Sequence, residues 1–323
     1  MDTDEPKWAP GEELSFWPEL KVARAQQLLS EMNMMLAVWS KGSTVKTRKV
    51  ISDDQHRIDI FVDIPAPPPV SEMSLVLGDA VHNLRSALDA VVWELANLDQ
   101  ENPPKNPREV TFPICLTEAQ WDRKVREALE TVPPVALDRL RSVQPFMFER
   151  GADSALVRLH ATDIRDKHKG ALSCAFTVRE IATELATLEY VDEDEIPDPP
   201  FTVATEEVDA LANGQRVLSI HSSARFEKVS LPLTIGSEIT METDAGRVPL
   251  QPLVQVFLEQ VRGTLDILYY GINAARARNE RMAADAVRRI SESNIAAGDM
   301  PTALPGDDLE WEATAESNPE RDA

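Results

Sequence analysis

Residues 71–98 carry the most regular pattern of apolar and polar positions in the chain. Apolar residues recur there at intervals of three and four, which places them in one stripe along an α-helix. Ser71 is suited to cap the first turn, and Glu72 is favoured there by the helix dipole. The segment therefore predicts a central helix whose stripe packs on other helices: Leu77, Val81, Leu84, Leu88, Val91, Leu95 and Leu98.

The opposite face of this helix has an unusual composition. Asp79, His82, Ser86, Asp89 and Trp93 recur there, also at intervals of three and four. A face that meets only water would usually carry longer side chains such as Lys, Glu and Gln. Short side chains that form hydrogen bonds predict instead a second buried or half-buried contact. Arg85 lies between the two faces, close to Gly78, where another backbone has room to approach.

The same reasoning predicts the other elements. Helical stripes indicate long helices near 18–39, 154–168 and 249–292, with shorter helices at 117–131 and 134–143. Alternating β-branched segments on either side of Asp53 and Asp54 predict a hairpin. Further alternation predicts strands at 171–178, 201–205, 216–222, 225–231 and 237–243. The order of elements favours an α+β fold, with a helical core packed beside an antiparallel β-sheet.

The negative charge of the chain is concentrated in three segments. The net charge of the 323 residues is −22. Three segments, 1–13, 180–209 and 299–323, together carry this whole excess, so the remainder is balanced. We expect a disordered acidic leader at 1–13, a single α+β domain at 14–293 and a disordered acidic tail at 294–323. Non-specific nucleic-acid binding through a basic surface is disfavoured.

Few classes of site are suggested by composition. Cys115 and Cys174 are the only cysteines, which argues against a disulfide framework and against a zinc site built from thiolates. No apolar run is long enough for a membrane helix, and residues 1–13 do not resemble a signal peptide. We therefore expect a cytoplasmic protein with no membrane contact, no cofactor and no metal site. His56 and His221, in strand-like segments, are predicted to be surface or packing residues.

Residues 155–170 hold the second group of unusual polar side chains. His160, Asp163 and Lys167 fall on the same side of the predicted helix as its apolar residues. An unpaired charge in such a position is costly, so each charged group needs a partner. Asp163 and Lys167 are four residues apart and can pair with each other. We further predict that Asp163 or Asp166 contacts Arg85 or His82 on the central helix.

Four short motifs carry a resemblance to a known family. They are HNLRSALD at 82–89, FPI at 112–114, the Gln144-Pro145 turn and DKH at 166–168. In this order they resemble a widespread family of uncharacterised bacterial and phage proteins, over about residues 70–270. The resemblance implies a helix, an extended element, a turn and a second helix, followed by strands and a closing helix. It implies no activity.

A more distant similarity is to HEPN domains, helical bundles that often act as RNases. Their motif is an Arg followed by a His four to six residues later on one helix. Arg85 has the matching setting, but Ala90 stands five residues on and no His follows in range. The catalytic candidates under this resemblance are Arg85 with His82, or with His168 if the fold brings it close.

Three functions remain open at this point. The first is a binding or interaction protein with no obvious catalytic site, which contacts a protein partner through its charged C-terminal helix and tail, or forms a homo-oligomer through that helix. The alternative is a HEPN-like RNase or other nucleic-acid-processing protein of phage or defence type. The third is a metal-dependent hydrolase. Under the first function, a polar network fastens two helices together; it comprises Asp79, His82, Arg85, Asp89, His160, Asp163, Asp166 and Lys167.

Overall fold

A computed structural model describes residues 7–43, 45–183, 187–206, 210–230, 233–244 and 246–284. The fold class is α+β, as predicted, because long helices are combined with antiparallel sheets. The chain divides into two units, residues 1–275 and 276–323, and each is described by itself. Within the described residues, no helix is both long enough and apolar enough to cross a membrane.

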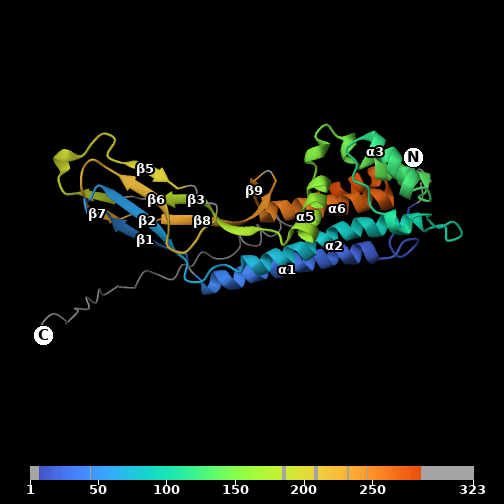
Figure 1. The fold of residues 1–323 in the computed structure, drawn as a ribbon, viewed down its shortest axis with the longest axis horizontal. Helices are drawn as coiled ribbons and strands as arrows, with labels where there is room; N and C mark the ends of the chain where they lie inside the picture. Colours follow the sequence, from blue (N-terminus) through green and yellow to red (C-terminus); the bar gives the residue numbers. More distant parts are fainter. Residues whose placement is uncertain are drawn as a thin grey trace. The chain divides into compact units, whose positions relative to one another are not determined.

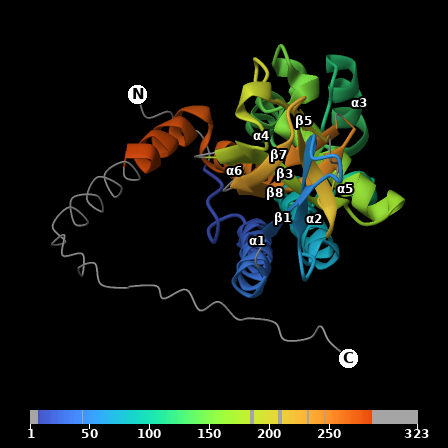
Figure 2. The ribbon, with the colours of Figure 1, turned by 90° about the vertical axis from the view of Figure 1, so that its left-hand side faces the viewer.

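Helix α1 (Trp17–Gly42) lies along α2 (Val70–Ala96), and the two views agree on this pairing (Figures 1 and 2). The pair is antiparallel: Ser15 bonds to Glu94 at one end, and Trp39 Nε1 donates to the Ala66 carbonyl at the other. The predicted stripe of α2 is buried from Leu77 to Leu95 and half-buried at Leu98. Ser71 does not cap α2. The helix begins one residue earlier, and Pro69 stands at its N-cap.

The predicted second buried face of α2 is wrong for most of its length. Asp79, His82 and Trp93 are exposed, whereas Ser86 and Asp89 are half-buried. Periodicity gathers these side chains on one face, but other segments cover that face only in part. Helix α5 (Ala155–Lys169) contacts α2 near the start of this face, and the loop that follows α2 contacts it at Asp89.

Local signals set the ends of the other helices. Ser154 caps α5 through the Val157 N–H, and Gly170, with φ of 107°, follows its last residue. The expected helix over 249–292 is instead interrupted, because Gly271 has a φ of 82° and ends α6 (Leu250–Tyr270). Residues 272–284 are again helical, and 285–292 lie outside the described residues. The remaining helices are α3 (Glu118–Ala128), α4 (Pro134–Ser142), α6 (Leu250–Tyr270) and the short 3₁₀ segments η1 (Pro107–Glu109), η2 (Pro145–Met147), η3 (Gly151–Asp153) and η4 (Glu193–Glu195).

The strands of the described residues form three antiparallel sheets, where a single sheet was expected. The first has the order β1 (Lys46–Ile51), β2 (Arg57–Asp63), β6 (Gln215–His221) and β5 (Thr202–Thr205). The second joins β3 (Cys174–Thr183), β8 (Leu233–Thr243) and β9 (Gly246–Pro249), and the third joins β4 (Thr187–Tyr190) and β7 (Phe226–Ser230). The hairpin of β1 and β2 is confirmed, with Ile51 opposite Ile58.

The acidic leader packs against the helices at Trp8. Its indole is only 3% exposed and lies under the Arg139 guanidinium, 5.1 Å from the ring centroid. Leu14 is buried as well. The expectation of a leader without packing is therefore wrong from Trp8 onward, because a buried indole stabilises even a segment that is otherwise polar. Residues 1–6 and the tail at 294–323 lie outside the described residues.

Candidate functional site

The predicted contact between α2 and α5 is present at Asp163. Its buried carboxylate lies 3.2 Å from His82 Nδ1 through Oδ1 and 2.7 Å from Lys167 Nζ through Oδ2. A carboxylate accepts hydrogen bonds, so His82 donates through Nδ1. The contact with Asp163 uses Nδ1 alone, and the ring that carries the other nitrogen, Nε2, is half-exposed. The expected pairing of Asp163 with Lys167 is also confirmed.

Arg85 has different partners from those expected. Its guanidinium is buried and contacts Asp89 Oδ1 at 2.6 Å, four residues along the same helix. It also donates to the Phe112 carbonyl at 2.9 Å, while the Phe112 N–H donates to the same Asp89 oxygen. The predicted contact of Asp163 or Asp166 with Arg85 or His82 is therefore made by His82. Arg85 instead forms a local pair with Asp89, and this pair holds the loop that follows α2.

The residues of the HNLRSALD, FPI and Gln144-Pro145 motifs lie where separate segments meet. Arg85 and Asp89, from HNLRSALD, hold both polar groups of the Phe112 backbone. At the other end of the same extended element, Gln144 Oε1 accepts from the Cys115 N–H at 3.0 Å. The Gln144 side chain is fully buried and donates to the Leu140 carbonyl as well. These motifs therefore supply the hydrogen bonds that join α2, the FPI element and the turn after α4.

Asp166 and His160 complete the α2–α5 cluster. Asp166 faces Gly78, where an added Cβ would lie 2.6 Å from its Oδ1, so a larger residue there would push the Asp166 carboxylate aside. Burial, and then the nearby carboxylates of Asp163 and Asp79, raise the pKa of Asp166. Burial, and then Arg85, lower the pKa of His160. His168, the other HEPN-type candidate, is exposed near the end of α5.

The part of the chain that the structure describes contains no set of metal ligands. No group of three His, Cys, Asp or Glu side chains is placed there to hold a metal ion. The carboxylate of Asp163, which could serve as one ligand, is already bonded to His82 and Lys167.

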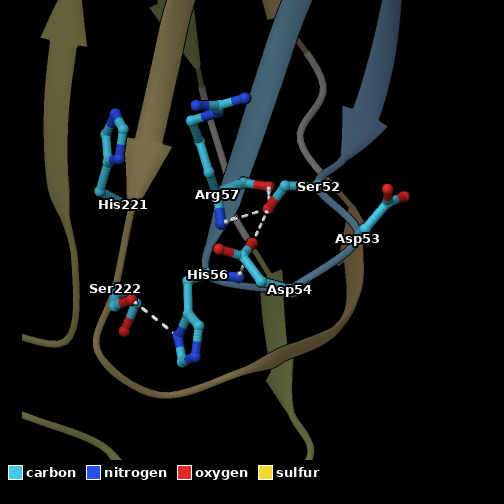
Figure 3. Close-up of a pocket in the computed structure, with 7 residues that line it drawn as sticks. All are labelled: Ser52, Asp53, Asp54, His56, Arg57, His221 and Ser222. Carbon is cyan, nitrogen blue, oxygen red and sulfur yellow. Dashed lines mark hydrogen bonds between the residues drawn. The ribbon is translucent and has the colours of Figure 1, made fainter.

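A polar pocket of about 480 Å³ lies at the tip of the β1–β2 hairpin, beside the end of β6 (Figure 3). His56 and His221 both line it, because antiparallel pairing of β2 with β6 sets Arg57 opposite His221. The His56 ring donates from Nδ1 to the Ser222 carbonyl at 3.2 Å. Hydrogen bonds from Ser52 and from the His56 backbone lower the pKa of Asp54. Acidic and basic groups are mixed in this pocket, so it favours no single charge of ligand.

A second pocket, of about 310 Å³, lies between α1 and α2 and is called here the aromatic pocket. Its lining includes Trp17, Lys21, Ser86, Asp89, Ala90 and Trp93. The indoles of Trp17 and Trp93 are 55% and 43% exposed, and Phe16 and Leu20 are exposed nearby in the sequence. We call Phe16, Trp17, Leu20 and Trp93 the aromatic surface. Sequence reasoning missed Trp17; the available signal was that two consecutive aromatic residues cannot both join the apolar stripe of α1.

Comparisons with protein-family models, with curated proteins and with solved structures found no match for this chain. The functional argument therefore depends on the geometry of the described residues.

Proposed function

We propose that this protein acts by binding a protein partner, which docks on the aromatic surface of α1 and α2. The observation that carries this proposal is the exposure of Trp17 and Trp93 around one pocket. Aromatic side chains bury a large apolar area on association, and indoles are frequent anchors of protein interfaces. Exposed apolar side chains that gather around one pocket are typical of protein interaction sites.

The polar cluster of α2 and α5 supports the same proposal, because its charged groups are occupied by structural contacts. Asp163 is shared by His82 and Lys167, and Arg85 is buried against Asp89 and Phe112. The proposed contacts through the C-terminal helix concern residues 272–284, whose side chains are largely exposed, and a tail outside the described residues. Homo-oligomer formation through that helix stays part of the proposal.

A HEPN-like RNase, or another nucleic-acid-processing protein of phage or defence type, is the alternative function. Such an RNase needs an Arg and a His directed at one phosphate. His82 offers a half-exposed ring oriented by Asp163, which favours this alternative, but the Arg85 guanidinium is turned to Asp89 and Phe112. A metal-dependent hydrolase gains no support from the described residues.

Site-specific crosslinking tests the proposed function. A photoreactive amino acid is placed at Phe16 or Leu20, and at Val256 on α6 as a matched exposed control. Full-length protein carrying each probe is irradiated in cells of its source organism. We expect a discrete protein adduct from the first two positions and none from Val256. Equal labelling at all three positions, or no adduct, would contradict the proposal. RNA cleavage that is lost in His82→Ala without a change in Tm would favour the alternative.

A further inference from the structure

The lining of the aromatic pocket combines small and bulky side chains. Ser86 and Ala90, which are one turn apart on α2, are small. Trp93 on α2 and Trp17 on α1 are large and aromatic. A pocket of about 310 Å³ accommodates one large side chain rather than a helix or a strand.

Asp89 gives the pocket an open acceptor. The bonds from Arg85 and from the Phe112 N–H both end on Oδ1, and the side chain is 34% exposed. Oδ2 of the same carboxylate is therefore left to receive another donor. Glu94 also lines the pocket, but both of its oxygens are bonded to Ser15. A donor that enters the pocket is thus directed to Asp89.

One indole of the pocket already interacts with a cation. The ammonium of Lys21 lies over Trp17, 5.0 Å from the ring centroid. The negative face of an indole attracts cations, and it attracts the planar guanidinium of arginine in particular. Two indoles beside a carboxylate oxygen combine the two groups that bind a guanidinium: a ring to stack on and an acceptor for its N–H groups.

We propose that the aromatic pocket binds an arginine side chain of the protein partner. This inference rests on the proposed function and names the chemistry of the partner at that site. Because Lys21 already covers a face of Trp17, the guanidinium stacks on Trp93. It donates to Asp89 Oδ2, while its methylene groups cover Ala90. An apolar side chain would remove water from Asp89 without replacing its hydrogen bonds. An acidic side chain would be attracted by the Lys21 ammonium but would meet the two carboxylates of Asp89 and Glu94.

The test uses the indole N–H signals of the full-length protein in two-dimensional NMR. The probe is N-acetyl-arginine amide, and its control is N-acetyl-citrulline amide, which has nearly the same shape but no charge. Trp17→Phe and Trp93→Phe assign the two signals of the pocket. Trp8 and Trp121 are buried and serve as internal controls. We expect the Trp17 and Trp93 signals to move together and to saturate, with a Kd of about 1–10 mM for so small a ligand.

The variants sharpen this result. Trp93→Ala, at an exposed position, is expected to weaken the arginine response of the Trp17 signal at least about tenfold, whereas Val256→Ala should leave it unchanged. Signals that stay still at about 50 mM arginine amide, well above the expected Kd, or that respond equally to citrulline, overturn the inference. If adducts form at Phe16 and Leu20 but arginine does not bind, this inference fails while the proposed function stands. Arginine binding without any adduct supports the pocket chemistry and contradicts the proposed function.

Discussion

Asp163 on α5 accepts a hydrogen bond from His82 on α2, with 3.2 Å between Oδ1 and Nδ1. The same carboxylate is 2.7 Å from Lys167 Nζ, so one buried acceptor serves two groups that can each carry positive charge. Arg85 and Asp89 form a second contact, which fixes the Phe112 backbone beside α2. Together these two contacts connect α2 with segments that are far apart in the sequence.

Asp163→Asn should lower the free energy of unfolding by about 1–3 kcal/mol, because hydrogen bonds to a charged acceptor are lost in a buried position. Urea unfolding measures this change. Asp153→Asn is the matched control, since Asp153 also pairs with a cation, Arg150, but its side chain is 56% exposed. The control should change stability by less than about 0.5 kcal/mol. Equal losses in the two variants would show that the Asp163 contact does not stabilise the fold.

Arg85→Ala should cost about 1–3 kcal/mol, because the buried Phe112 carbonyl loses its donor and the half-buried Asp89 loses its cation. Arg123→Ala removes another pair at a spacing of four, with Glu127, whose members are both exposed. That control should cost less than about 0.5 kcal/mol. Thermal unfolding and RNA cleavage are measured on the same samples. An Arg85→Ala protein that keeps its Tm and loses a cleavage activity would contradict the structural role of Arg85.

Leu84→Ala and Leu88→Ala should each cost about 2–5 kcal/mol, because both side chains are fully buried in the helical core. Leu75 lies on the same helix but is 63% exposed, so Leu75→Ala is the control and should be nearly neutral. Chemical denaturation reports all three values. A costly Leu75→Ala beside a mild Leu84→Ala would mean that the buried face of α2 is assigned incorrectly.

Deletion of residues 1–13 should lower the free energy of unfolding by about 3–5 kcal/mol, the range for loss of a buried indole, since Trp8 is removed. Trp8→Ala in the full chain should account for most of that loss. Deletion of 294–323 is predicted from the sequence to leave Tm unchanged, because that segment has no apolar periodicity. Differential scanning calorimetry distinguishes the two truncations. A neutral leader deletion would rule out the stabilising role of Trp8.

Asp166→Asn should stabilise the protein at neutral and higher pH. The pKa of Asp166 is raised in the folded protein above its ordinary value of 3.8, so ionisation of this group costs folding free energy. The variant cannot ionise and should be more stable by up to about 1 kcal/mol at about pH 8, a modest gain because the group is partly solvated. This advantage should shrink as the pH falls toward 3.8. Unfolding curves across that pH range check it, and a difference that does not vary with pH would exclude the mechanism.

The elements of the fold could be predicted because periodicity determines which residues share a face. The buried stripe from Leu77 to Leu95 and the β1–β2 hairpin were predicted in this way. The number of sheets could not be predicted, since the pairing of β2 with β6 joins residues that are more than 150 positions apart. The break at Gly271 was missed because the apolar stripe of α6 continues up to it.

The candidate site was predictable only where spacing along one helix decides a contact. Asp163 and Lys167 are such a pair. Arg85 had an equally local partner in Asp89. The hydrogen bonds of the Phe112 backbone to Arg85 and Asp89, however, depend on the path of the loop after α2. The aromatic pocket depends on the register of α1 against α2, which brings Trp17 beside Trp93. The sequence pattern of α1 or of α2 alone does not determine how the two helices are aligned.

The most direct test of the binding function is the Kd for the crosslinked partner, measured with wild-type protein and with the double variant Trp17→Ala/Trp93→Ala. Both indoles are exposed, so the Tm of the variant should stay within a few degrees of the wild-type value. An interface anchor is worth about 2 kcal/mol or more, so we predict that Kd rises by at least about thirtyfold, whereas Val256→Ala leaves it unchanged. A double variant that binds the partner as tightly as the wild type would contradict the assignment of the aromatic surface as the docking site.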